Sequence, residues 1–215
     1  YDRLPAFSSF LPGLAGVKGI PMWTFYTNRG QGMNSFGIDN KGNAIMEFNS
    51  ANTAFENTTV KGFRTFLKID GEYYEPFFTY EKEAKRQIRM NKNSFKIIET
   101  NEKYGIEVTV NYFILPNESI GALVRQVSVK NISDSAKDIE VIDGLPKIIT
   151  YGISNGEFKE MSNLFKSWAY IKNIDNKVPY YTLRASTKDS AEVSDVEGGY
   201  YYLTIKDGEL QDVIY

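Results

Sequence analysis

The stretch Ile106-Glu107-Val108-Thr109-Val110-Asn111-Tyr112-Phe113-Ile114 decides the fold class. Apolar and polar side chains alternate along it through Asn111. Because successive side chains of an extended chain point to opposite sides, this alternation predicts a strand with one buried face. We expect that face to carry Ile106, Val108, Val110, Tyr112 and Ile114.

Weaker runs of the same kind flank this strand on both sides. They are rich in Val, Ile and aromatic residues, and turn formers such as Asp70-Gly71 and Asp207-Gly208 accompany them. The turn-forming cluster from Asn131 to Ser135 joins two of the runs and predicts a hairpin between them. The runs cover residues 44–48, 66–74, 94–99, 122–130, 138–142, 180–185 and 200–205. Short strands spaced by turns predict an all-β fold, a large antiparallel β-sandwich, rather than alternating strands and helices.

One short helix is expected among the strands. Ser154 and Glu157 have the spacing of a capping box, in which each side chain bonds the backbone N–H of the other residue. Large apolar side chains then recur at helical intervals as far as Ile171, namely Phe158, Met161, Phe165 and Trp168. The sequence therefore predicts an amphipathic helix inserted into the β-sandwich.

The first 34 residues have an unusual composition, in which prolines and glycines punctuate a series of aromatic residues. Proline and glycine at this density oppose a helix or a long strand, whereas the aromatic rings favour burial. We therefore expect residues 1–34 to form an extended segment laid over the sandwich, or a loop that lines a groove. Residues 35–215 are expected to form the sandwich itself as one domain, because no internal repeat or linker is visible.

The composition argues against several classes of partner and chemistry. The 25 basic and 27 acidic side chains are spread along the 215 residues, so we expect no surface for nucleic acid or anionic membrane. The absence of cysteine excludes disulfides and thiolate metal sites. The absence of histidine excludes the Ser/His/Asp triad and most zinc sites. We therefore expect no metal and no cofactor.

The sequence also bears on location. No apolar run is long enough for a membrane span, and the N-terminus does not resemble a signal peptide. A cytoplasmic protein is therefore expected. The sequence begins at Tyr1 rather than Met and stops within strand-forming residues, so we expect it to be part of a longer chain.

The segment from Trp23 to Gly32 is the main candidate for ligand binding. It combines aromatic rings, an arginine and amides on a glycine-containing stretch. Such a mixture binds sugars, because rings cover the apolar C–H faces while amides and Arg satisfy the hydroxyl groups. Alternatively, the rings simply anchor a covering strand. The candidate sugar-binding residues are Trp23, Tyr26, Asn28, Arg29 and Gln31.

A hydrolytic site would need two cooperating carboxylates, one acting as acid and the other as base or nucleophile. Glu47, Asp143 and Glu160 are available, but nothing in their spacing singles out a pair among the 27 acidic residues. We therefore predict no catalytic residue in this sequence.

Several longer motifs resemble the N-terminal region of the β-1,2-oligoglucan phosphorylases. This family belongs to the group of inverting phosphorylases that includes the cellobiose and chitobiose enzymes, formerly classed as glycosyltransferase family 36. The similarity runs nearly from end to end. It rests on Phe7–Gly13, Gly19–Trp23, Asn28–Gln31, Gly62–Phe66, Ile142–Pro146, Met161–Asn163 and Leu183–Thr187.

This resemblance implies a large β-sandwich of the galactose-mutarotase-like type, a supersandwich, at the start of a multidomain enzyme. In that group the catalytic acid and the phosphate site lie in a later (α/α)6 barrel. The reaction is phosphorolysis of a β-glucan oligosaccharide by inorganic phosphate, giving α-glucose 1-phosphate. Mutarotase chemistry itself does not carry over, because it requires histidine. The resemblance thus implies a noncatalytic domain.

In the same group the sandwich helps to form a homodimer and lends a loop to the substrate cleft of the other subunit. By position, the segment from Tyr151 to Trp168 resembles that loop. The resemblance therefore makes Tyr151, Asn155, Lys159, Asn163 and Trp168 candidates for a cross-subunit cleft. Two alternatives remain open: a free-standing carbohydrate-binding module, and, less favoured, an epimerase or hydrolase that acts alone.

Overall fold

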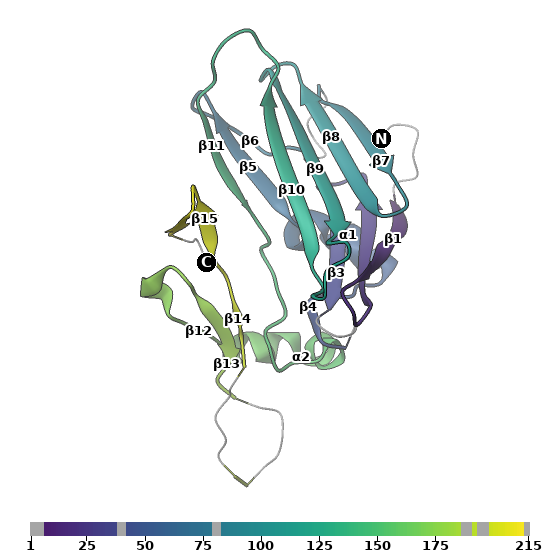
Figure 1. Cartoon of the computed structure of the whole chain (residues 1–215), viewed down its shortest axis with the longest axis vertical. Coiled ribbons are helices and arrows are strands. Elements are labelled where there is room, and N and C mark those ends of the chain that lie inside the picture. The colour runs from purple at the N-terminus through teal and green to yellow at the C-terminus, as the bar shows by residue number, and fades with distance from the viewer. Residues whose placement is uncertain (1–6, 38–41, 79–82, 186–190, 193–197, 213–215) are drawn as a thin grey trace.

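The computed structural model describes residues 7–37, 42–78, 83–185, 191–192 and 198–212 of the chain. Its architecture is mostly β, with several antiparallel sheets and a few short helices, as Figure 1 shows. The predicted all-β, sandwich-like fold is confirmed.

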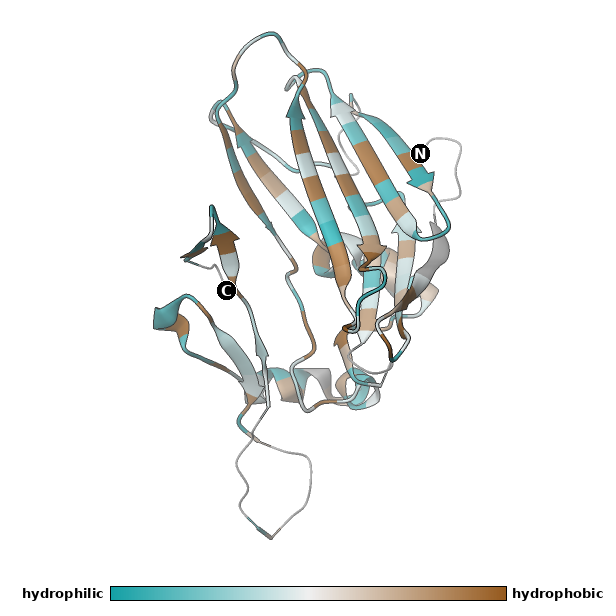
Figure 2. Cartoon of the chain, in the orientation of Figure 1, coloured by the Kyte–Doolittle hydropathy of each residue, from teal (hydrophilic) through white to brown (hydrophobic). Residues whose placement is uncertain are grey.

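The larger layer of the sandwich is a four-stranded antiparallel sheet in the order β10-β9-β8-β7. The strands span Lys85–Met90 (β7), Ser94–Asn101 (β8), Ile106–Ile114 (β9) and Leu123–Asn131 (β10). Strand β9 has the predicted bounds, and Ile106, Val108, Val110 and Tyr112 are buried as expected. Figure 2 shows hydrophobic and hydrophilic positions alternating along this sheet.

The facing layer is a three-stranded sheet in the order β11-β5-β6. Its strands are Arg64–Ile69 (β5), Glu72–Tyr74 (β6) and Ile139–Gly144 (β11). Asp70 and Gly71 form the predicted turn between β5 and β6, both with positive φ, as a tight hairpin of this kind requires. Inward side chains of the two layers form the main core, which includes Leu67, Ile69, Tyr74, Phe95, Ile97, Val108 and Val110.

The predicted hairpin between the runs at 122–130 and 138–142 is wrong. Strand β10 pairs with β9, whereas β11 pairs with β5, with Ile142 opposite Phe66. The turn formers after Asn131 therefore carry the chain from one layer to the other. Turn chemistry predicts where a strand ends, but the partner of the next strand depends on which face has apolar surface left to cover.

A buried carboxylate ties the two layers together. Glu99 on β8 is only 1% exposed, and it accepts hydrogen bonds from the Tyr74 hydroxyl, the Arg86 guanidinium and the backbone N–H of Phe77, the last at 2.9 Å. Since Arg86 also forms an ion pair with it, the charge of Glu99 is compensated inside the protein.

The N-terminal segment forms a sheet of its own in the order β1-β2-β3-β4. The strands are Phe7–Ala15 (β1), Ile20–Thr27 (β2), Met33–Gly37 (β3) and Ala44–Met46 (β4). The expectation that proline and glycine would prevent long strands here is wrong. The register shifts between Phe10 and Gly13, and β1 is an edge strand, which tolerates a residue without an N–H.

Two α-helices are present in the described part of the chain. Helix α1, Ala51–Lys61, packs on β2 and β3 through Ala54 and Thr58 and was not predicted. Helix α2, Asn155–Trp168, has the predicted capping box of Ser154 and Glu157. It ends before Ile171 because the chain enters a strand at Ala169.

The C-terminal part builds two small sheets beside the sandwich (Figure 1). Ala169–Lys172 (β12), Tyr180–Leu183 (β13) and Tyr200–Tyr201 (β14) form the first, with a 3-10 turn at Ile174–Asn176. Thr204–Lys206 (β15) and Glu209–Gln211 (β16) form the second. A separate core attaches this part to α2 and includes Ile149, Ile153, Phe158, Phe165 and Leu183.

Candidate functional site

A cleft of about 750 Å³ lies between the sandwich and the C-terminal strands. One side comes from β10, β11 and the segment that follows β11; the other comes from β13, β14 and Tyr202. We call it the tyrosine cleft. Its lining consists of Ile45, Phe63, Arg125, Asp143, Gly144, Leu145, Pro146, Lys147, Ile148, Tyr181, Gly199, Tyr200, Tyr201 and Tyr202. A volume of this size is typical of small-molecule sites.

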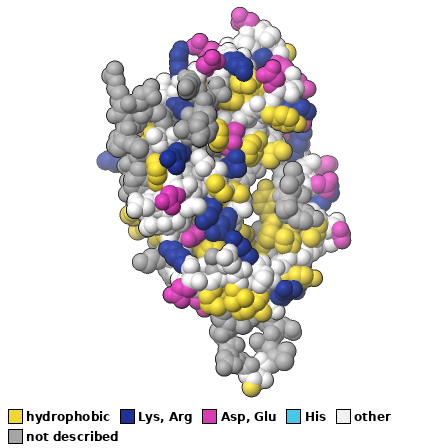
Figure 3. Space-filling view, turned by 180° about the vertical axis from the view of Figure 1, so that it is seen from behind, with side chains coloured by type: hydrophobic (Ala, Val, Ile, Leu, Met, Phe, Trp, Pro, Cys, Tyr) yellow, Lys and Arg dark blue, Asp and Glu magenta, His cyan; other side chains and the backbone are white. Residues whose placement is uncertain are grey.

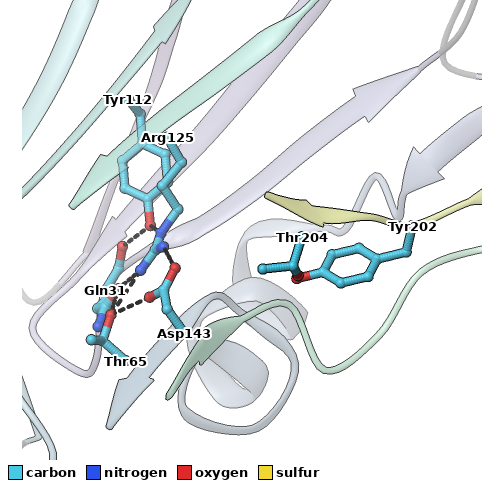
Figure 4. Close-up of polar contacts among 7 residues, drawn as sticks. All are labelled: Gln31, Thr65, Tyr112, Arg125, Asp143, Tyr202 and Thr204. Atoms are coloured by element: carbon cyan, nitrogen blue, oxygen red, sulfur yellow. Dashed lines mark hydrogen bonds and ion pairs between the residues drawn. The ribbon is translucent and has the colours of Figure 1, made fainter. Parts of the chain in front are cut away.

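The polar part of the lining is a hydrogen-bonded group that we call the Arg125 network. Arg125 donates to the carboxylate of Asp143, to Gln31 Oε1, to Thr65 Oγ1 at 3.0 Å and to the Tyr112 hydroxyl at 3.2 Å. Thr65 donates to the Asp143 carboxylate at 2.6 Å. Figure 4 shows these side chains converging on the guanidinium group.

The Arg125 network joins the two layers of the sandwich. Arg125 comes from β10, whereas Thr65 and Asp143 lie opposite each other on β5 and β11. The Arg125 side chain is 6% exposed and that of Asp143 is 33% exposed, so the carboxylate is the member that solvent reaches. The Phe63 ring centroid lies 4.8 Å from the guanidinium carbon of Arg125.

Burial affects the pKa values of two members of the Arg125 network, Tyr112 and Arg125. Burial raises the pKa of the Tyr112 hydroxyl, so the group stays neutral and donates to the backbone carbonyl of Gln31 at 3.2 Å. Burial alone would lower the pKa of Arg125, but Tyr112 and Asp143 more than offset that effect and the pKa lies above its ordinary value. The Arg125 network thus consists of the Arg125–Asp143 ion pair and the uncharged side chains of Tyr112, Thr65 and Gln31 that are hydrogen-bonded to it.

The opposite wall is aromatic. Tyr200 packs edge-on against Tyr151 with ring centroids 5.8 Å apart, and burial raises the pKa of Tyr200 to about 12. Tyr201 and Tyr202 are 68% and 44% exposed, and the Tyr202 hydroxyl accepts a hydrogen bond from Thr204 at 3.3 Å. Figure 4 shows Tyr202 and Thr204 across from the Arg125 network. These rings offer the exposed apolar faces on which a sugar can stack.

Two glycines let the chain reach this wall. A Cβ atom on Gly198 would lie 1.8 Å from the Tyr151 ring, and one on Gly199 would lie 2.3 Å from Cζ of Tyr180. Both distances are far below any real contact. A side chain at either position would therefore displace the neighbouring tyrosine ring or the segment that carries Tyr200 and Tyr201.

A second ion pair lies at the edge of the cleft. Lys147 Nζ is 3.1 Å from Glu47 Oε2 and 4.4 Å from the centroid of the Phe158 ring. Burial lowers the pKa of Lys147, an effect that Glu47 opposes and that repulsion from Lys61 and Lys166 reinforces. Figure 3 shows Lys and Arg side chains gathered near the middle of the back face.

The candidate sugar-binding residues of the N-terminal segment lie mostly outside this cleft. Gln31 is buried and belongs to the Arg125 network. Tyr26 is buried in the sandwich core, and Trp23 packs beside Phe25 at the α1 cluster. Arg29 stacks on Phe55 with its guanidinium carbon 4.2 Å from the ring centroid, and Asn28 is half-buried with Oδ1 unbonded.

The candidate cross-subunit residues lie on and before α2. Tyr151 and Asn163 are exposed, and Trp168 packs edge-on against Phe165. Asn155 accepts a hydrogen bond from the backbone N–H of Phe48 at 3.1 Å, and Lys159 donates to the carbonyl of the same residue. Asn155 and Lys159 are thus used to hold α2 against the chain after β4.

Sequence reasoning missed the residues that make the cleft. Tyr200, Tyr201 and Tyr202 follow directly on Gly198 and Gly199, so an aromatic run behind two glycines was the available signal. Arg125 carried no such signal, because its role depends on β10 and β11 belonging to different layers.

The carboxylates named as possible acids are not paired with one another. Glu47 pairs with Lys147, and Asp143 pairs with Arg125. Across the described residues, no group of three or more Asp, Glu, His or Cys side chains is placed to hold a metal ion. Neither α-helix of the described chain is long and apolar enough to span a membrane.

Known proteins add no family assignment. Neither a scan of protein-family models nor a search of curated proteins returned a match to this sequence.

Proposed function

We propose that this chain is a noncatalytic, carbohydrate-binding β-sandwich domain that acts within an inverting β-glucan phosphorylase. The observation that carries the proposal is the tyrosine cleft, which is lined on one side by exposed tyrosine rings and on the other by the Arg125 network. Aromatic faces opposite a few fixed polar groups are the usual means by which proteins bind sugars.

A noncatalytic role is supported by the way the acidic groups are used. The Asp143 carboxylate is engaged by Arg125 and Thr65, and Glu47 is engaged by Lys147. A glycosidase needs one carboxyl group that gives up a proton and a second that acts as base or nucleophile. Carboxylates compensated by cations fit binding better than proton transfer.

The proposed part in a homodimer is supported by apolar exposure around α2. Met161, Leu164 and Tyr170 are each 39% exposed or more. Met161 and Leu164 lie on α2 and Tyr170 on the adjoining β12, and exposed apolar side chains gathered in this way favour contact with another protein surface. Sedimentation equilibrium tests this part: a dimer that Leu164→Asp weakens supports it, and a monomer at every concentration contradicts dimerisation by this chain alone.

Calorimetric titration tests the binding. The chain is titrated with β-1,2- and β-1,4-gluco-oligosaccharides, and we expect saturable binding that Tyr202→Ala weakens. Tyr73→Ala is the matched control, because Tyr73 is 82% exposed and lies outside the cleft lining. Absence of binding at millimolar ligand would exclude a carbohydrate-binding role.

A second assay tests the absence of catalysis. The chain is incubated with oligoglucan and inorganic phosphate, and we expect no release of α-glucose 1-phosphate. Measurable turnover contradicts the proposal.

The second candidate is a free-standing carbohydrate-binding module. It is favoured by one observation: both walls of the tyrosine cleft come from a single chain. The two candidates differ in the length of the natural protein, so the reading frame beyond residue 215 separates them. Helix pairs with an acidic motif there favour the phosphorylase, and a stop codon favours the module.

A further inference from the structure

The Arg125 network holds its charged pair in one fixed position. Arginine has five N–H donors, and four hydrogen bonds from Arg125 go to Tyr112, Asp143, Gln31 and Thr65. Only one of the two Nη1 N–H groups is used, and it goes to Asp143. Among the described residues, the other Nη1 N–H has no acceptor.

Asp143 has hydrogen-bonding capacity left as well. One oxygen accepts from Thr65 and the other from Arg125, yet a carboxylate has about four lone-pair sites. Its side chain is 33% exposed and lines the cleft. Arg125 and Asp143 both line the tyrosine cleft, so a carboxylate with unused acceptor sites and a guanidinium with one unused N–H lie side by side in its lining.

Two neighbouring hydroxyl groups of a sugar ring complement this arrangement. One hydroxyl donates to the carboxylate and the next accepts from the guanidinium, as in the paired recognition that makes arginine and carboxylate groups selective. Tyr202 lines the same cleft and lies across from this pair, with its hydroxyl bonded to Thr204 (Figure 4). Its exposed ring is available to stack on the apolar face of a sugar in the cleft.

We propose that Asp143 and Arg125 bind a vicinal diol of a pyranose stacked on Tyr202, so that the cleft selects glucans whose internal residues keep such a diol. This inference rests on the proposed carbohydrate-binding function. Internal residues of β-1,2- and β-1,4-glucans keep two adjacent free hydroxyl groups. Internal residues of β-1,3-glucans do not, because their substituted O3 lies between the free hydroxyl groups on C2 and C4.

Selectivity between glucan linkages tests the proposal. We titrate the chain with β-1,4- and β-1,3-linked glucohexaose of equal length, and expect the β-1,3 ligand to bind at least about tenfold more weakly. Asp143→Asn is expected to bring this ratio close to one. Glu140→Gln is the matched control and should leave the ratio unchanged, because Glu140 pairs with the exposed Lys68 and lies outside the cleft lining.

A second variant guards against loss of folding. Asp143→Glu keeps the charge opposite Arg125 but moves the carboxylate by one methylene group, so it should also abolish the selectivity while thermal unfolding stays close to that of the parent.

The outcomes separate the inference from the proposed function. Equal binding of both linkages, or selectivity that survives in both Asp143 variants, overturns the selection of glucans by an internal diol while carbohydrate binding stands. If neither hexaose binds, both the inference and the proposed carbohydrate-binding function are overturned.

Discussion

Gly199→Ala is the sharpest structural test of the tyrosine cleft. A Cβ atom at this position would lie 2.3 Å from Cζ of Tyr180, whereas ordinary contact begins at 3.4 Å. The difference, 3.4 minus 2.3, requires a movement of about 1.1 Å. The backbone at Gly199 does not have positive φ, so alanine adds a steric conflict without backbone strain.

The groups that have to move belong to, or lie beside, the aromatic wall of the tyrosine cleft. Either the strand that carries Tyr200 and Tyr201 shifts, or the Tyr180 ring swings away from its place beside it. Overpacking of this kind costs about 1 to 3 kcal/mol. If glucan binding requires the wall in its original position, this cost is subtracted from the binding free energy. Glucan affinity then falls by about tenfold or more, since 1.4 kcal/mol corresponds to a factor of ten.

The assay is calorimetric titration of the parent and the variant with the same β-glucan oligosaccharide. Gly156→Ala is the matched control, because its Cβ would meet nothing closer than 3.9 Å and the residue lies in α2. We expect unchanged affinity for the control. Affinity of Gly199→Ala within about twofold of the parent would refute the reasoning that this strand positions the binding wall.

Three further predictions concern stability. Glu99→Ala should lower the free energy of unfolding by about 3 to 5 kcal/mol, because it leaves the Arg86 charge buried without its partner; urea denaturation measures this, and a loss under about 1 kcal/mol contradicts it. Burial raises the pKa of Tyr26 to about 12, so stability present below pH 10 is lost as pH rises towards 12, by about 2 to 3 kcal/mol; alkaline unfolding should be less steep in Tyr26→Phe, and equal steepness argues against it. Ser154→Ala should cost about 1 kcal/mol in thermal unfolding, since it removes the cap bond to the Glu157 N–H, and Ser154→Asp should retain most of that stability.

Local patterns in the sequence predicted individual elements well. The alternation from Ile106 to Ile114 gave the bounds of β9, because one face of that strand is buried along most of its length. The capping box located the start of α2, since Ser154 and Glu157 make both of its bonds. Helix α1 escaped prediction because its Thr and Asn residues favour other conformations, and packing through Ala54 and Thr58 stabilises it instead.

The candidate site was harder to predict because it depends on pairing between distant strands. Gln31 was selected for its amide, yet its partner Arg125 lies 94 positions further along the chain. Asp143 was noted as an acid without a partner, and its partner became visible only once β10 and β11 were seen in different layers. Strand alternation defines faces, but it does not say which strands meet.

The passage of the chain from β10 to β11 has a consequence for how binding and unfolding are connected. Because Arg125 belongs to one layer and Asp143 to the other, the two groups meet only while the layers face each other. Detachment of β11 from β5 would separate them even if the rest of the sandwich stayed intact. Ligand bound to both groups would therefore oppose local opening at β11, and hydrogen exchange of the β11 amides would slow by the factor 1 + L/Kd, where L is the free ligand concentration.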